Sequence, residues 1–272
     1  MPRPDEALPV PHALALGALH GPTELLPVSS SAHTELVPWL LDWPYATLDG
    51  ELRKAFEVAL HAGTATALLV GLRDEVAAAA RGLDARRLGL MLGSFVPPAL
   101  VGYGLERPIE ERLGTPRTIA WGLLAGAVAL ALADAVGPQR RDRAQAGARD
   151  ALALGVAQAC ALVPGVSRNG ATLTAARLRG FRRRDANVLS RHVALPIIVG
   201  ATALKGTRLA RRGLPRPMAA AFAAGVGASF ASTLASVRVL RAVERGRPFL
   251  PWALYRVALA VVVLRRCENP PR

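Results

Sequence analysis

The sequence is short of cysteine and aromatic residues, and these two shortages narrow the classes of protein to which the chain of 272 residues can belong. Its only cysteines are Cys160 and Cys267, which excludes a small fold held by several disulfides and leaves no metal-binding cysteine spacing. Aromatic residues make up 5% of the chain and are not interleaved with its basic segments as base stacking requires. A nucleic-acid partner is therefore not expected, although the net charge is +14.

Charged residues are also missing from several long stretches. The uncharged runs are 88–105, 118–133, 151–167 and 217–237, and Glu57 is the only charge in 55–72. These runs are at or near the length that crosses a hydrocarbon core of about 30 Å. Because 51% of the residues are hydrophobic, disorder is excluded, and so many uncharged runs favour an all-α membrane protein over a soluble helical bundle.

Basic residues are concentrated between the apolar runs, in segments such as 138–150, 177–185 and 205–216. This alternation is typical of loops that connect membrane spans and not of a DNA-reading face. We therefore expect a multi-pass protein that is held in the membrane by its own spans.

Two ordered blocks of sequence occur twice. ALALG at 13–17 recurs at 151–155, and VAL at 58–60 with ATAL at 65–68 recurs at 193–195 and 201–204. Each copy of the first block is followed by a proline and then by serine residues. We predict a single transmembrane domain, 1–272, with internal repeats at approximately 8–135 and 151–266.

Each predicted repeat begins with an interrupted apolar hairpin, at about 8–41 and 151–190, and continues with about three spans. The first arms, 8–19 and 151–163, contain 12 and 13 residues and reach only about 20 Å, too short to cross. We expect them to be re-entrant half-helices. An odd number of full spans in each half would invert the second repeat and bring the two hairpin tips together near the midplane.

Both tips carry signals for a helix break followed by a new helix. In the first tip, Pro22 and Pro27 are expected to end the incoming helix, and the serines at 29–31 are suited to cap the outgoing one. The second tip has a Pro164-Gly165 break, then Ser167 as the cap and Arg168. Two facing helix N-termini with an arginine would make a binding site for an anion.

Several reactive side chains lie at these tips. A charge at the bilayer centre costs roughly 3 kcal/mol, so Glu24 and Arg168 need an explanation. One explanation is a structural ion pair or a water-facing loop. The other is catalysis, because His20 and His33 could move protons and Ser30 could act as nucleophile or phosphate ligand, a set suited to phosphoryl transfer.

Four further residues have candidate roles in packing or in support of the site. Glu57 and His61 are four apart on one helix face, and either support the site, including a metal, or satisfy each other in the core. Arg256 is expected to be packed or snorkelling instead of belonging to the site. Cys160 is expected to be a small apolar filler.

Three motifs in this order give the sequence a resemblance to a known family. They are TELLPVSSSAH at 23–33, FEVALHAGT at 56–64 and PGVSRNGAT at 164–172. With them the chain resembles, over nearly its whole length, the undecaprenyl pyrophosphate phosphatases of the integral-membrane bacitracin-resistance type. The resemblance implies two inverted repeats with re-entrant hairpins in the bacterial cytoplasmic membrane. It also implies removal of the terminal phosphate of undecaprenyl diphosphate, which recycles the lipid carrier for cell-wall synthesis.

By position, the resemblance matches the family's acid, serine and histidine to Glu24, Ser30 and His33, and its second-motif pair to Ser167 and Arg168. The expected catalytic residues are Glu24, Ser30, His33, Arg168 and His20; the expected substrate-binding residues are Ser29, Ser31, Gly165, Ser167, Arg168 and Asn169; the expected metal ligand is Glu24. The chain departs from the family pattern at His20, where a Glu is common, at Asn169, where a Ser is common, and at His61, where Gln is frequent.

The expected substrate is a polyprenyl diphosphate lipid, whose tail would lie between spans while the diphosphate occupies the gap between the tips. Glu24 would place a magnesium or calcium ion or the attacking group, and His33 would take the proton from Ser30 or from a water. The bilayer and a second copy of the chain, in a homodimer, are the other expected partners. The alternative function is a transporter or flippase for a polyprenyl phosphate or another anionic solute, because broken helices in inverted repeats are also found in secondary transporters.

Overall fold

The computed structural model describes residues 8–212, 216–243 and 246–269, and these residues form helices and no strand. The helices are α1 (Val10–Leu25), α2 (Ser30–Leu40), η2 (Pro44–Thr47), α3 (Gly50–Gly71), α4 (Arg73–Arg81), α5 (Ala85–Leu113), α6 (Pro116–Val136), η3 (Arg143–Gln145), α7 (Ala148–Cys160), α8 (Arg168–Leu178), α9 (Arg183–Arg212), α10 (Arg216–Val243) and α11 (Leu250–Glu268). The all-α prediction is confirmed.

Within the described residues, three helices contain segments long and apolar enough to cross a membrane: Ala85–Leu105, Pro116–Val136 and Pro217–Val237. These segments contain three of the uncharged runs of the sequence, 88–105, 118–133 and 217–237, which were predicted to be membrane spans. Large apolar side chains on two of these helices point outward, with exposures of 68% for Leu100, 59% for Leu132 and 70% for Val136. Exposing so many apolar side chains to water is unfavourable, whereas contact with lipid acyl chains is favourable.

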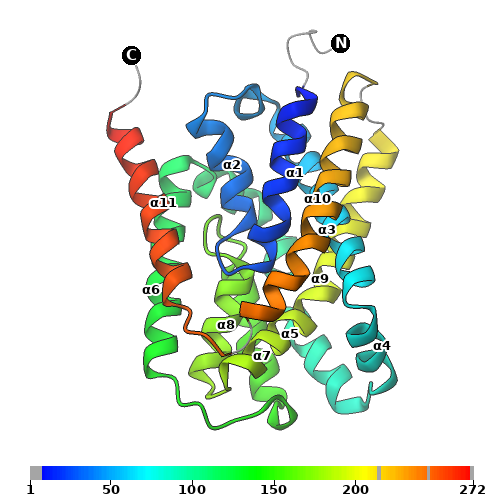
Figure 1. The fold of residues 1–272 in the computed structure, drawn as a ribbon, viewed down its shortest axis with the longest axis vertical. Helices are drawn as coiled ribbons and strands as arrows, with labels where there is room; N and C mark the ends of the chain where they lie inside the picture. The colour runs from blue at the N-terminus through cyan, green and yellow to red at the C-terminus, as the bar shows by residue number, and fades with distance from the viewer. Residues whose placement is uncertain (1–7, 213–215, 244–245, 270–272) are drawn as a thin grey trace.

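Two helical hairpins enter the molecule from opposite ends (Figure 1). α1 and α2 descend from the end that holds both chain termini and return to it, while α7 and α8 rise from the other end. The loops of both hairpins lie at middle height (Figure 1). Each hairpin therefore places the beginning of its second helix, α2 or α8, inside the molecule.

The first hairpin differs from the prediction at Pro22. α1 does not end there but continues to Leu25, so that Pro22 lies inside the helix. The missing proline N–H disrupts the helix only locally, and the hydroxyl of Thr23 donates to the carbonyls of Leu19 and His20 at 2.8 and 3.2 Å. As a result His20 and Glu24, four residues apart, share a face in the last turns of α1 and do not lie in a loop.

Close helix packing holds the first hairpin in place. α1 packs along α10, and α10 packs against α3. The contact is tight at Gly17, where an added Cβ would lie 2.8 Å from the Cβ of Ala228. In the other part of the molecule α7 packs against α5, and α8 lies between α7, α6 and α9. α6 and α11 pack together.

Candidate active site

Glu24 is the point at which the two hairpins meet. It lies in the last turn of α1 with 8% of its surface exposed. One carboxylate oxygen accepts a hydrogen bond from the Ser30 hydroxyl of the first hairpin, and the other pairs with the guanidinium of Arg168 from the second. The structure therefore brings together three of the predicted residues, from segments more than 130 residues apart in the sequence.

Serine caps direct both second helices toward this point. Ser29 precedes α2 and accepts from the N–H of Ala32, while Ser167 precedes α8 and accepts from the N–H of Gly170. Both serines have a positive φ, 75° and 66°, which is uncommon for a residue with a side chain and costs about 1 kcal/mol or more. The predicted serine caps are present, and each sets the first residue of the following helix beside Glu24.

His33 lies one turn into α2, but both of its ring nitrogens have other partners. Nδ1 lies 2.6 Å from the carbonyl oxygen of Ser29, which only accepts, so Nδ1 is the donor. The neutral ring then accepts at Nε2 from the hydroxyl of Tyr255, 2.7 Å away, and the two rings stack. The hydroxyl of Ser30 instead donates to Glu24. The structure thus gives Ser30 a carboxylate, and not His33, as its proton acceptor.

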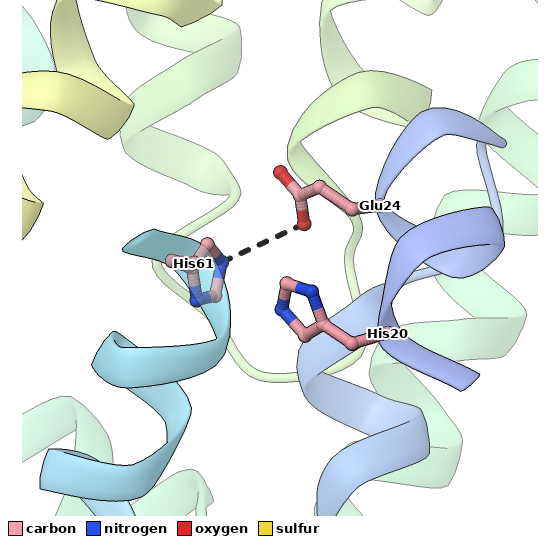
Figure 2. A group of neighbouring side chains, drawn as sticks. All are labelled: His20, Glu24 and His61. Carbon is pink, nitrogen blue, oxygen red and sulfur yellow. Dashed lines mark ion pairs between the residues drawn. The ribbon is translucent and has the colours of Figure 1, made fainter. Parts of the chain in front are cut away.

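His20 and His61 lie beside Glu24 (Figure 2). His20 is fully buried, and its ring centroid lies 4.5 Å from that of His61. His61 extends from α3, with Nε2 3.5 Å from a carboxylate oxygen of Glu24. Its Nδ1 bonds the backbone oxygen of Glu57 at 2.9 Å. His61 therefore faces the site, and its link to Glu57 is through the backbone.

Asn169 ties the two hairpins together. Its amide donates to the carbonyl of Leu25 at 2.8 Å, and its oxygen accepts from Ser190 of α9 at 2.8 Å.

Gly165, predicted to bind substrate, has a φ of 92° and lies against α6, where a Cβ would come within 2.9 Å of the Leu123 nitrogen. Ser31 pairs with the Ser29 hydroxyl at 3.3 Å.

α11 supplies two supporting residues, one to each hairpin. Tyr255 contacts His33, and the neighbouring Arg256 donates to the carbonyls of Gly165 and Val166 at 3.1 and 2.9 Å. Arg256 is fully buried, so it is packed and does not snorkel. Sequence reasoning missed Tyr255, which lies in no motif.

Cys160, expected as a packed filler, is a free and exposed thiol, because it ends α7 at the edge of the loop.

A cavity of about 700 Å³ begins at this cluster. Its polar end is lined by Glu24, Arg168, Asn169 and Ser190. Apolar side chains from several helices line much of the remainder; they include Leu68, Leu69, Leu72, Leu90, Met91, Leu189, Ile198 and Val199. The cavity also reaches the charged residues Glu75, Arg86, Arg87, Arg143 and Arg191. An anionic headgroup with an attached apolar chain suits such a lining.

The fold and the site together define an all-α, multi-pass membrane protein with an internal serine, carboxylate and arginine at the end of an amphiphilic cavity. Residues 13–262 match the family described as Bacitracin resistance protein BacA. The chain belongs to this family, and it is a bacterial multi-pass membrane protein.

Curated relatives agree with this assignment over almost the full chain. A protein of Geobacter sulfurreducens is 41% identical over 265 residues, which cover 93% of this chain and 96% of the relative. A protein of Pelobacter propionicus is 42% identical over 259 residues, covering 90% and 93%. One of Geobacter metallireducens is 39% identical over 265 residues, covering 93% and 96%. All three are named undecaprenyl-diphosphatase.

Proposed function

We propose that this chain is an undecaprenyl-diphosphatase, which hydrolyses undecaprenyl diphosphate to undecaprenyl phosphate and inorganic phosphate. This reaction returns the lipid carrier to peptidoglycan synthesis and confers resistance to bacitracin. The observation that carries the proposal is the sharing of Glu24 by Ser30 and Arg168, one from each hairpin, at the polar end of the cavity. The names of the relatives support the same substrate.

In the proposed complex the diphosphate lies beside Arg168, and the isoprenoid chain extends along the apolar wall of the cavity. A guanidinium binds phosphate oxygens in a bidentate manner, so Arg168 would exchange its carboxylate partner for the substrate. The exchange frees one oxygen of Glu24. Ser167 and the N–H groups at the start of α8 would add further donors to the phosphate.

The proposed chemistry then uses the other half of the cluster. The Ser30 oxygen attacks the terminal phosphorus, and Glu24 takes the hydroxyl proton. The bond from that phosphorus to the bridging oxygen breaks, undecaprenyl phosphate leaves, and a water hydrolyses the phosphoserine to release phosphate. The alternative is direct attack by a water whose proton Glu24 accepts. His33, linked to Tyr255, would hold the start of α2 in position.

The expected magnesium or calcium ion fits the observed residues poorly. These ions select oxygen ligands, whereas the groups around Glu24 are one carboxylate and the imidazoles of His20 and His61. We route no step of the mechanism through such an ion.

We also propose that the chain is built from two inverted repeats with re-entrant hairpins. Matching packing supports this, since α1 lies along α10 as α7 lies along α5. Matching caps support it too, because Ser29 and Ser167 share an unusual positive φ and the helices that follow both have 11 residues. The homodimer stays a prediction.

Reconstituted protein in liposomes tests the function against the transport alternative. With undecaprenyl diphosphate as substrate, we expect one inorganic phosphate for each undecaprenyl phosphate formed. Passage of intact diphosphate lipid across the bilayer without phosphate release would contradict the proposal and favour a transporter.

A further inference from the structure

Two imidazoles and a carboxylate converge where the proposed mechanism uses only the carboxylate. His20, Glu24 and His61 each offer one donor atom, and these atoms lie within 4.8 Å of one another. Figure 2 shows the three side chains pointing together, two from α1 and one from α3. Histidine and glutamate at such spacing form the usual nitrogen and oxygen set for a metal ion.

The hydrogen bonds around His61 fix which of its nitrogens has a free lone pair. Nδ1 lies 2.9 Å from the Glu57 carbonyl oxygen, which cannot donate, so Nδ1 carries the proton. In the neutral ring Nε2 is then an acceptor, and it faces a carboxylate oxygen of Glu24 at 3.5 Å. Two acceptors at this distance need a positive charge between them, either a proton or a metal ion.

The hydrogen bonds around His20 are compatible with the same result. The Ser229 hydroxyl donates to the Leu60 carbonyl at 2.8 Å, so the Thr64 hydroxyl, 2.9 Å from Ser229 and 3.1 Å from the Thr233 hydroxyl, has acceptors for its proton other than His20. The Thr64 oxygen can therefore accept from Nδ1 of His20, which lies 3.0 Å away. In that tautomer Nε2 of His20 carries a lone pair, and it is buried with no hydrogen-bond partner among the described residues.

We propose that His20 Nε2, His61 Nε2 and the Glu24 carboxylate bind one first-row transition-metal dication of the zinc type. Imidazole nitrogen favours such ions, and the set provides few of the oxygens that magnesium and calcium require. In a tetrahedral site with bonds of about 2.1 Å, neighbouring donors lie about 3.4 Å apart, close to the 3.5 Å between His61 and Glu24.

The outer contacts of the imidazoles match those of a built metal site. The other nitrogen of each ring has a partner, a backbone carbonyl for His61 and a buried hydroxyl for His20. Such partners fix the tautomer and the orientation of metal-binding histidines. Three protein ligands also leave a position open, and under the proposed function, on which this last point rests, a phosphate oxygen of the substrate would occupy it.

Cobalt binding tests the site without any substrate. The full chain, with its tag removed and both cysteines changed to alanine, is purified in detergent, treated with chelator and titrated with Co²⁺ while its visible absorption is recorded. We expect one Co²⁺ per chain, displaced by Zn²⁺ and not by the same concentration of Mg²⁺. His20→Gln and His61→Gln should each weaken binding by at least about tenfold. His12→Gln, which removes a histidine stacked on Trp43, is the matched control and should bind as the parent does.

Unchanged Co²⁺ affinity in both the His20→Gln and His61→Gln proteins would overturn the proposal, as would displacement by equimolar Mg²⁺. His20→Glu exchanges a nitrogen ligand for oxygen, so it should weaken Co²⁺ binding and strengthen Mg²⁺ binding. Phosphate release is measured separately. Protein that binds Co²⁺ as expected but releases no phosphate contradicts the proposed hydrolysis alone, and protein that releases phosphate but binds no Co²⁺ contradicts the metal site alone.

Discussion

Glu24 has a different partner on each carboxylate oxygen, and this arrangement explains how a charged group is retained inside the protein. Arg168 neutralises it, and Ser30 satisfies the second oxygen. A buried carboxylate without such partners would cost several kcal/mol. The same pairing keeps the arginine in place until a phosphate competes for it. In our proposal the resting ion pair is therefore also the substrate-binding device.

A change of Asn169 to Asp tests whether the anion binds at this end of the cavity. Asn169→Asp keeps the shape, loses the amide donation to Leu25, and adds a negative charge beside the proposed phosphate position. Repulsion of about 1.4 kcal/mol would raise KM for undecaprenyl diphosphate about tenfold. This KM is measured from steady-state rates of phosphate release.

Asn187→Asp is the matched control for this experiment. Asn187 is also on the inside of the protein, but its amide donates within α9 to the Arg183 carbonyl, and the residue does not line the cavity. The KM of the Asn187→Asp variant should stay within about twofold of the parent value. Equal KM values for the two aspartate variants would contradict the proposed position of the diphosphate.

Sequence reasoning was most successful for single residues that lie next to helix breaks. Pro and Gly followed by Ser predict a cap from local chemistry alone, and both caps are found, at Ser29 and Ser167. The partner of His33 could not be predicted in this way. Tyr255 meets it only through packing between residues 222 positions apart, for which a single sequence carries no signal.

At the scale of the helix, α1 differs most from the prediction. Proline at position 22 favoured a helix end, yet the helix continues to Leu25. Propensity was overridden by tertiary packing, because α10 covers this part of α1 and the Thr23 hydroxyl binds nearby carbonyls. The additional turn places Glu24 on the same helix face as His20.

Close contact of α1 with α10 gives a test at this scale. In Gly17→Val the new Cβ would lie 2.8 Å from the Cβ of Ala228 and 3.0 Å from the Ser229 nitrogen. Overpacking of this kind costs about 1–3 kcal/mol, so the apparent Tm in detergent should fall by about 2–10 °C. In Gly227→Val the new Cβ has no neighbour within 4 Å, and this control should change Tm little. Similar Tm values for both variants would contradict the tight α1–α10 contact.

For the whole molecule, the central feature is that segments from both halves of the chain form one site. α11 reinforces this, since its adjacent residues Tyr255 and Arg256 support the first and the second hairpin respectively. Missing charges and repeated blocks in the sequence predicted the membrane class and the two interrupted hairpins. They could not predict the cavity or the inward turn of His61, which depend on how α3, α9 and α10 pack around the hairpins.

The most direct test of this account is the rate of phosphate release from undecaprenyl diphosphate by variants of each hairpin. Ser30→Ala alters the first and Arg168→Ala the second, while Arg140→Ala changes an exposed loop arginine as a control. We predict that both hairpin variants stay folded in the membrane and lose at least about 10²-fold in turnover, and that the control keeps the parent rate. Parent-level turnover in either hairpin variant would contradict a single active site built from both.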